Sequence, residues 1–209
     1  MREILCFGDS NTYGYIPDGS GRYSEDIRWT GLLQKKLASE ATVIEEGLCG
    51  RTTVFQDELR AGRRGSELLP VLLESHYPLN LVTVMLGTND CKTVYGASAE
   101  VIGKGVEQLI NQIKQRAPQA KILLLSPILL GDDVWKPEYD PEFSRESVQV
   151  SKKLKDVYRR IAEKHNCLFL AASDVTDPSA TDQEHLDEKG HERLADAIYE
   201  VVRKNLAVA

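Results

Sequence analysis

Short apolar runs alternate with longer amphipathic stretches along the chain. The short runs are typical of buried strands and cover residues 4–7, 42–45, 81–86, 121–126 and 167–170. The longer stretches carry apolar residues at a spacing of three to four, which predicts helices over residues 30–38, 66–75, 98–116, 143–164 and 188–204. Strands that are apolar on both faces and alternate with helices predict a parallel sheet covered on both sides. We therefore expect an α/β fold, a three-layer α/β/α sandwich with a five-stranded parallel sheet, in one domain over residues 1–209.

Small polar residues follow the predicted strands. In such a sheet the ligand site lies beyond the carboxyl ends of the strands, where the strand order reverses. The segments at these ends are Gly8-Asp9-Ser10-Asn11, residues 46–51, Gly87-Thr88-Asn89-Asp90, Ser126-Pro127-Ile128 and the loop through Asp182 and His185. The sequence thus predicts that polar side chains from distant segments meet at one edge of the sheet.

Ser10 stands at the first of these strand ends. A serine hydroxyl becomes an effective nucleophile when a histidine takes its proton and a carboxylate orients that histidine. A spacing of three residues can bring Asp182 beside the imidazole of His185. We predict Ser10, His185 and Asp182 to be the catalytic nucleophile, base and orienting carboxylate. The alternative is a strand-to-helix corner at Ser10 and a helix cap at Asp182.

Acyl transfer also needs hydrogen-bond donors that face the developing oxyanion. Three candidates share the same edge: the backbone N–H of Ser10, the backbone N–H of Gly50 and the side-chain amide of Asn89. Glycine suits the second position because no side chain blocks the approach of a substrate. A simple turn at Gly50 and a backbone contact of Asn89 are the alternatives.

The loops at residues 13–28 and 130–141 are long, and long loops at the ligand edge of a sheet are often binding loops. They carry or adjoin five aromatic residues, Tyr13, Tyr15, Trp29, Trp135 and Tyr139. These residues are expected to form an aromatic wall around an acyl pocket, with loop anchoring or an oligomer contact as the alternative. The predicted substrate contacts are Asn11, Trp29, Cys49, Ile128 and Trp135.

The ordered set of GDSN, Gly50, GTND and D-x-x-H resembles the four blocks of the SGNH, or GDSL-type, hydrolases. The resemblance spans nearly the whole chain. It implies a flavodoxin-like SGNH hydrolase fold. It also implies the roles of nucleophile, orienting carboxylate, base and oxyanion donors for Ser10, Asp182, His185, Gly50 and Asn89, with Ser10 acting twice.

Four longer stretches, ILCFGDSNTYGY, DIRWTGLL, VIEEGLCGRTT and VMLGTND, are similar to the bacterial arylesterase and acyltransferase branch of that family. Members of this branch can transfer acyl groups to alcohols even in water. The chain departs from the branch at Asn11, where the branch has leucine, and at Cys49-Gly50, where it has Ser-Ala. The acyl-chain preference is therefore not carried over.

The resemblance implies a serine esterase that hydrolyses short-chain aryl or alkyl esters through an acyl-enzyme, with no metal or organic cofactor. Deacetylation of acetylated saccharides and hydrolysis of thioesters remain open, because the chemistry at the carbonyl is shared. The non-enzymatic alternative is a flavodoxin-like protein that binds a small ligand. Its weakness is the first turn, which lacks the glycine spacing of phosphate-binding loops.

The resemblance implies a small-molecule ester as the partner, and composition argues against two other classes of partner. The formal net charge of −6 argues against nucleic acid and against an anionic membrane surface. No apolar run approaches the roughly 20 residues that span a bilayer, and no export signal precedes the first strand, so we expect a cytoplasmic location. The scattered cysteines predict free thiols and no metal site, with Cys6 and Cys167 in the core.

Other charged and titratable residues are expected to be structural. Asp9 and Asp90 are predicted to organise loops, and His191 to be a partly exposed residue of the last helix. The basic residues Arg60, Arg63 and Arg64 are expected to be solvated. Alternatively, they form a self-association surface with Leu68, Leu69 and Leu72. The arylesterase branch implies a homo-oligomer built in part from this region.

Overall fold

One parallel sheet forms the centre of the protein. The computed structural model describes residues 2–205. The sheet has five strands in the order β2-β1-β3-β4-β5, and all neighbouring pairs are parallel. The strands are β1 (Arg2–Gly8), β2 (Ala41–Gly47), β3 (Leu81–Met85), β4 (Lys121–Ser126) and β5 (Leu168–Ala171).

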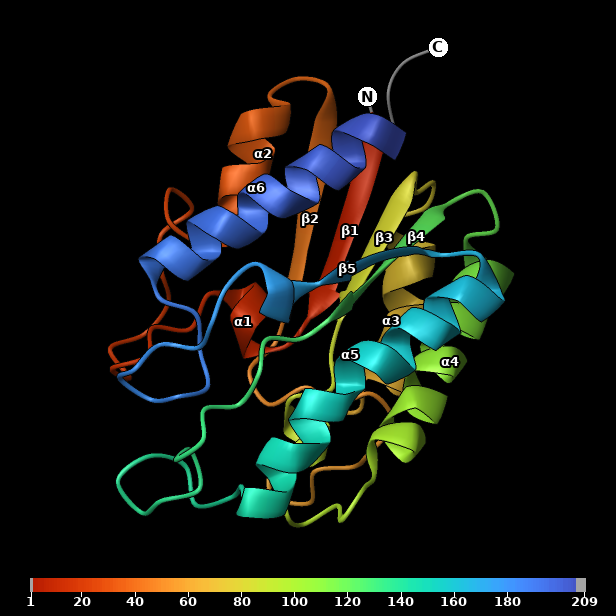
Figure 1. Ribbon diagram of the computed structural model, residues 1–209. Coiled ribbons are helices and arrows are strands. Elements are labelled where there is room, and N and C mark those ends of the chain that lie inside the picture. Colours follow the sequence, from red (N-terminus) through yellow and green to blue (C-terminus); the bar gives the residue numbers. More distant parts are fainter. Residues whose placement is uncertain (1, 206–209) are drawn as a thin grey trace.

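Helices cover both faces of this sheet, which confirms the predicted three-layer sandwich. The α-helices are α1 (Ser10–Tyr13), α2 (Trp29–Leu37), α3 (Gly65–Ser75), α4 (Ala99–Arg116), α5 (Arg145–His165) and α6 (Glu188–Asn205). Helices α2 and α6 pack together on one face, and α3, α4 and α5 lie on the other (Figure 1). The predicted strands and longer helices begin and end within two residues of those observed. The short α1 and two 3₁₀ helices, η1 (Asn89–Cys91) and η2 (Ala172–Asp174), were not predicted.

The central strand β1 shows why residues 4–7 are apolar at every position. Ile4 and Cys6 pack in the apolar cluster under α2 and α6, whereas Leu5 and Phe7 pack in the cluster under α3, α4 and α5. All four side chains are fully buried. Successive residues of a strand point to opposite faces, so a strand covered by helices on both sides must be apolar throughout.

The strand order reverses beside β1. From β1 the chain crosses through α2 to β2 at one edge, and then returns through α3 to β3 on the other side of β1. The loops that follow β1 and β3 therefore leave the sheet next to each other, at the place where open α/β sheets bind ligands. Ser10 follows β1 directly, and Asn89 follows β3.

Local signals in the sequence set the ends of α5. At its start, the Ser144 hydroxyl accepts a hydrogen bond from the backbone N–H of Ser147, and the Ser147 hydroxyl accepts one from Ser144 N–H. This reciprocal capping box satisfies two N–H groups that the helix itself cannot pair. At its end, Asn166 adopts the left-handed conformation with φ 53°, which stops the helix.

His191 on α6 corrects the expectation of a partly exposed residue. Its side chain is fully buried, and Nδ1 accepts a hydrogen bond of 3.2 Å from the backbone N–H of Trp29. Burial lowers the pKa of His191 to about 4. His191 is thus an uncharged imidazole whose hydrogen bond connects α6 with the first turn of α2.

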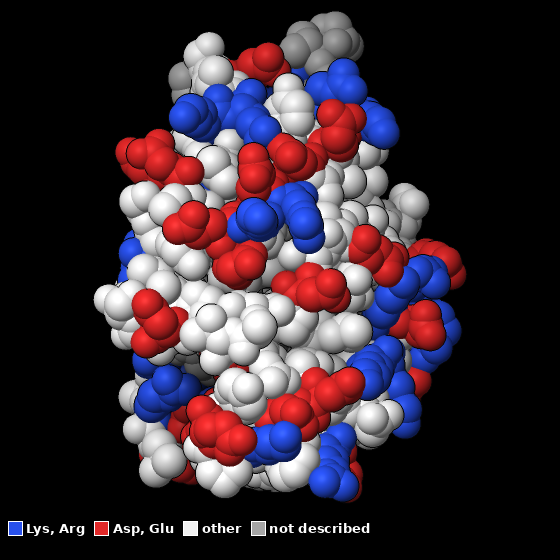
Figure 2. All heavy atoms as spheres, turned by 60° about the vertical axis from the view of Figure 1, so that its left-hand side comes forward, with Lys and Arg blue, Asp and Glu red and all other residues white. Residues whose placement is uncertain are grey.

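The cysteines are free thiols, as expected. Cys6 lies in the core, whereas Cys167 is only partly buried, which corrects its predicted core position. On the face shown in Figure 2, basic side chains are interspersed with acidic ones. Among residues 2–205, no helix combines the length and the apolar character needed to cross a membrane.

Candidate active site

Ser10 is the first residue of the short helix α1. The Asp9 carboxylate accepts a hydrogen bond of 3.0 Å from the backbone N–H of Asn11 and so caps this helix, as expected for a loop organiser. Gly14, with φ 85°, ends it. A Cβ at Gly8 would stand 2.0 Å from the Thr12 hydroxyl, so only glycine fits where the strand meets the helix. The corner thus holds the Ser10 hydroxyl at the carboxyl end of β1.

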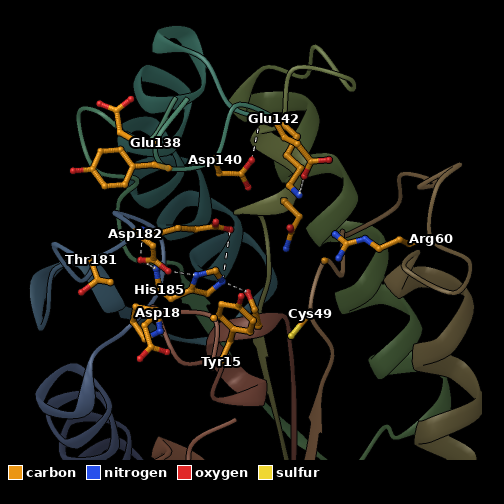
Figure 3. A pocket seen from close by; sticks show the side chains of 18 residues that line it. Tyr15, Asp18, Cys49, Arg60, Glu138, Asp140, Glu142, Thr181, Asp182 and His185 are labelled. Carbon is orange, nitrogen blue, oxygen red and sulfur yellow. Dashed lines mark hydrogen bonds and ion pairs between the residues drawn. The ribbon is translucent and has the colours of Figure 1, made fainter. Parts of the chain in front are cut away.

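His185 links Ser10 to Asp182. Its Nε2 lies 2.9 Å from Ser10 Oγ, and its Nδ1 lies 2.6 Å from Asp182 Oδ2. With the proton on Nδ1 donated to Asp182, Nε2 accepts the hydrogen bond from the Ser10 hydroxyl. The three predicted residues therefore form a continuous hydrogen-bonded chain, of which Figure 3 labels Asp182 and His185. Such a chain allows a proton to pass from the hydroxyl to the imidazole.

A tight turn holds Asp182 in this orientation. Its Oδ1 accepts hydrogen bonds from the backbone N–H groups of Glu184, at 3.1 Å, and His185, at 3.0 Å. Gln183, between them, has φ 61°, in the left-handed region. Because Oδ1 is occupied by backbone donors, Oδ2 is the oxygen directed at the imidazole.

Asn11 fixes the nucleophile to the loop that carries the base. Its Oδ1 accepts a hydrogen bond of 2.9 Å from Leu186 N–H, and its Nδ2 donates one of 3.3 Å to Glu184 O. The side chain is 3% exposed, and it does not line the cavity next to Ser10. This position corrects the expectation that Asn11 contacts substrate.

The residues that carry the three predicted oxyanion donors line one cavity. Gly50 and Asn89 line the same cavity as Ser10. One amide hydrogen of Asn89 is donated to Arg51 O at 3.1 Å, which leaves the second for another acceptor. Gly50 has φ 80°, and a Cβ there would meet the Arg60 guanidinium at 2.4 Å. The positive φ favours glycine here, whereas the Arg60 side chain could move to make room for a Cβ.

Arg51 holds the strand ends next to Ser10 and Gly50 in place. The sequence analysis did not identify this residue. Its guanidinium donates to Gly8 O at 2.9 Å and to Glu46 O, and it lies 4.2 Å from the centre of the Phe7 ring. Burial lowers the pKa of Arg51 to about 10. One buried cation thus ties the ends of β1 and β2, from which the Ser10 and Gly50 segments depart.

Asp90 organises the next loop, as predicted. Its carboxylate accepts hydrogen bonds from the backbone N–H and the hydroxyl of Thr53. Burial raises the pKa of Asp90 to about 6. The contact connects the segment after β3 with the segment after β2.

The cavity next to Ser10 has a volume of about 550 Å³ and a strongly polar wall. Six carboxylate residues line it, together with two basic ones: Asp18, Glu138, Asp140, Glu142, Asp182, Glu184, Arg60 and Lys92. Tyr15 and Tyr139 are its aromatic residues, and the Tyr15 ring lies 4.6 Å from the His185 ring. Figure 3 shows Asp182 and Asp18 near His185, with Glu138, Asp140 and Glu142 along another part of the lining and Arg60 on the side of Glu142. The expected aromatic wall is thus reduced to two tyrosines in an acidic surrounding.

Three other predicted contacts lie outside this cavity wall. Trp29 is fully buried under α6, and its indole N–H donates to Asn11 O at 3.1 Å. Ile128 belongs to the same apolar cluster. Trp135 packs partly buried against the opposite core, with its N–H donated to Asp132 O. These positions correct the expectation that Trp29, Ile128 and Trp135 contact substrate.

Cys49, which is predicted to contact substrate, lines the cavity. Burial raises the pKa of its thiol above the usual range. Its backbone carbonyl accepts a hydrogen bond of 3.0 Å from Arg63 Nε.

The basic cluster is not simply solvated. Arg60 lines the cavity and pairs with Asp57 at 3.3 Å, and Arg63 holds the loop at Cys49. Leu69, proposed with this cluster as part of a self-association surface, is fully buried in the core. Any such surface must therefore exclude Leu69.

Fold and site together define a serine ester hydrolase. The model of the GDSL-like lipase/acylhydrolase family matches residues 6–193, and the chain belongs to this family. This confirms the resemblance noted in the sequence, and with it an enzyme that cleaves acyl bonds.

Solved structures with similar sequences extend over nearly the whole chain. The native aryl esterase of M. smegmatis is 34% identical with a TM-score of 0.89, covering 98% of this chain and 99% of that one. A carbohydrate acetylesterase from Sinorhizobium meliloti is 35% identical with a TM-score of 0.90, at the same coverage. A further carbohydrate acetylesterase family member from that organism is 35% identical with a TM-score of 0.90, and both chains are covered completely. The comparison with curated proteins returned no match.

Proposed function

We propose that this protein hydrolyses short-chain carboxylic esters through an acyl-enzyme on Ser10. The observation that carries the proposal is the hydrogen-bonded chain from Ser10 Oγ through His185 to Asp182, open to a cavity of substrate size. His185 Nε2 takes the hydroxyl proton while Oγ attacks the ester carbonyl carbon. The same nitrogen then protonates the leaving alcohol, and water releases the acid in a second, equivalent step.

The oxyanion of each tetrahedral intermediate is stabilised by the N–H groups of Ser10 and Gly50 and by the amide of Asn89. The presence of all three residues in the lining of one cavity supports this role. The buried Arg51 and the Asp90 contact hold these segments before substrate binds, so little reorganisation is needed during the reaction.

The lining of the cavity supports a short acyl group. Burial of Trp29 and Ile128 in the core removes the large apolar side chains that a long acyl chain would need. The remaining wall consists mainly of carboxylates and polar groups, whose desolvation by an alkyl chain is unfavourable.

The polar cavity lining also suits a substrate with a polar leaving alcohol, which makes acetylated saccharides the second candidate substrates. Carboxylates such as Asp18, Glu138 and Asp140 can accept hydrogen bonds from sugar hydroxyls. Two of the similar structures are described as a carbohydrate acetylesterase and a member of such a family. Thioester hydrolysis and acyl transfer to alcohols remain open on the same chemistry. The homo-oligomer and the cytoplasmic location stay predictions.

A panel of substrates tests this function. We expect p-nitrophenyl acetate to be turned over with a kcat/KM at least tenfold above that of the octanoate, because the cavity offers little apolar wall to a long chain. Acetylated saccharides should be deacetylated at a higher kcat/KM than simple alkyl acetates. A preference for octanoate would contradict the short-acyl proposal, and equal rates on sugar and alkyl acetates would contradict the polar leaving group.

The dependence of activity on pH follows from His185. Burial lowers its pKa, but the nearby carboxylates of Glu184 and Asp182 outweigh burial, and the pKa is raised above the ordinary 6.5. Asp9 adds to this effect. Because the base must be neutral, we expect kcat/KM to be retained at high pH and lost as the pH falls through a midpoint above 6.5. A pH–rate profile of p-nitrophenyl acetate hydrolysis with a midpoint below 6.5 would contradict this assignment.

A further inference from the structure

Glu184 places a second carboxylate beside the imidazole of His185. Its Oε1 lies 3.8 Å from Nε2, the nitrogen that faces Ser10, whereas Asp182 binds the other nitrogen. Glu184 also lines the cavity together with Ser10. The imidazole therefore has an acidic group at each of its two nitrogens, and the proposed triad uses only one of them.

The backbone of Glu184 is fixed on both sides. Its N–H donates to Asp182 Oδ1 at 3.1 Å, and its carbonyl accepts from Asn11 Nδ2 at 3.3 Å. The left-handed conformation of Gln183 sets the direction of the turn. The backbone of Glu184 is thus held within the turn that carries Asp182 and His185.

The carboxylate of Glu184 is buried, and its contact with His185 at 3.8 Å is long for an ion pair. Glu184 is only 7% exposed, and within residues 2–205 its side-chain oxygens make no hydrogen bond. The charged groups around it are His185, Lys92, Asp140 and Asp182. Burial raises its pKa, but an acceptor oxygen is present in both ionisation states. A group of this kind next to Nε2 is available to whatever molecule approaches Nε2 from the cavity.

We propose that Glu184 orients the water that hydrolyses the acyl-enzyme, an inference that rests on the proposed function. In the acyl-enzyme Ser10 Oγ carries the acyl group, so Nε2 is free to accept a hydrogen bond from water. The second O–H of that water donates to Glu184 Oε1. The water oxygen attacks the acyl carbon while His185 takes a proton. The bond from the acyl carbon to Oγ then breaks, Oγ receives the proton, and the carboxylic acid leaves.

An alcohol cannot be held in this way. Water has two O–H groups and can donate to His185 and Glu184 together, whereas an alcohol has one and can donate only to His185. Glu184 therefore favours hydrolysis over acyl transfer, because only water can donate to both groups at once.

The test is the division of one acyl-enzyme between water and methanol. With p-nitrophenyl acetate as donor, the ratio of acetic acid to methyl acetate is measured over a series of methanol concentrations. Glu184→Leu should lower this ratio roughly tenfold, about the effect of one lost hydrogen bond. It should also produce a burst of p-nitrophenol followed by a slower steady rate. Glu184→Gln retains an acceptor oxygen and should restore the ratio to within about threefold of wild type.

Two further variants separate this role from a general loss of structure. Glu184→Asp keeps the charge but withdraws the oxygens from Nε2, so it should shift the ratio as Glu184→Leu does, and it replaces that variant if circular dichroism shows that leucine prevents folding. Glu163→Leu removes a carboxylate from an exposed position on α5 and should leave the ratio unchanged. A wild-type ratio in a folded Glu184→Leu or Glu184→Asp protein would overturn the inference.

The intact mass of the protein during turnover shows whether an acetyl adduct forms on Ser10. This measurement distinguishes a failure of the Glu184 role from a failure of the acyl-enzyme mechanism. An acetyl adduct on Ser10 with an unchanged ratio would overturn the role of Glu184 alone. If acetate is released and no adduct forms in any variant, the acyl-enzyme mechanism itself fails.

Discussion

Replacement of Ser10 by alanine is expected to abolish ester turnover, with a loss of at least about 10⁴-fold in kcat. The substitution removes the only atom that the proposed mechanism places between His185 and the ester carbonyl. Since Ser10 is 4% exposed and alanine is smaller, the fold should tolerate the change. The measurement is p-nitrophenyl acetate hydrolysis at matched folding by circular dichroism.

The control for this variant is Ser75→Ala. Ser75 lies exposed at the end of α3, and its hydroxyl donates to Leu72 O within the same helix. It should retain wild-type kcat and kcat/KM. Equal activity of wild type and a folded Ser10→Ala protein would show that the corner after β1 is only a structural turn, and the acyl-enzyme proposal would have to be abandoned.

The second large effect is expected for Asp182→Asn, which should lower kcat about 10³- to 10⁴-fold. Asparagine can keep its oxygen toward the N–H groups of Glu184 and His185, so the turn should survive. Its NH₂ group then faces Nδ1 and donates to it, which moves the imidazole proton to Nε2. In that tautomer His185 cannot accept the proton of Ser10.

Asp187→Asn makes the same chemical change in the same loop and serves as its control. Asp187 accepts a hydrogen bond of 2.7 Å from Gly190 N–H, a cap that asparagine also provides. Its activity should stay within about twofold of wild type. A loss in Asp187→Asn as large as in Asp182→Asn would indicate that the loop responds to charge alone, and the tautomer argument would not hold.

The fold could be predicted because its signals are local. Each strand is a short apolar run between amphipathic helices, and the cap at Ser144 marks the start of α5 within a few residues. The meeting of Ser10, Asn89 and His185 also follows, because parallel strands bring their carboxyl ends to one edge. The short helix α1 was missed because four residues are too few to show a periodic pattern.

The cavity wall could not be predicted, because it depends on packing between distant segments. Trp29 begins α2, and only the placement of α6 above it makes it a core residue. Asn11 lies beside the nucleophile in the chain, but its side chain turns to Leu186 on the other side of the site. Arg60 and Glu184 lie at the cavity through loop conformations, with φ 80° at Gly50 and 61° at Gln183, that no periodic pattern reveals.

The contact between Asn11 and Leu186 has a consequence for the timing of activity during synthesis. The proposed nucleophile and base stand 175 positions apart, and the side chain of Asn11 joins their two segments. A ribosome makes the chain from its N-terminus, so Ser10 emerges early and waits without its base. Only when the segment around His185 has left the exit tunnel can the two meet. A nascent chain therefore carries an inert serine, and catalysis starts only once the segment through His185 has been translated.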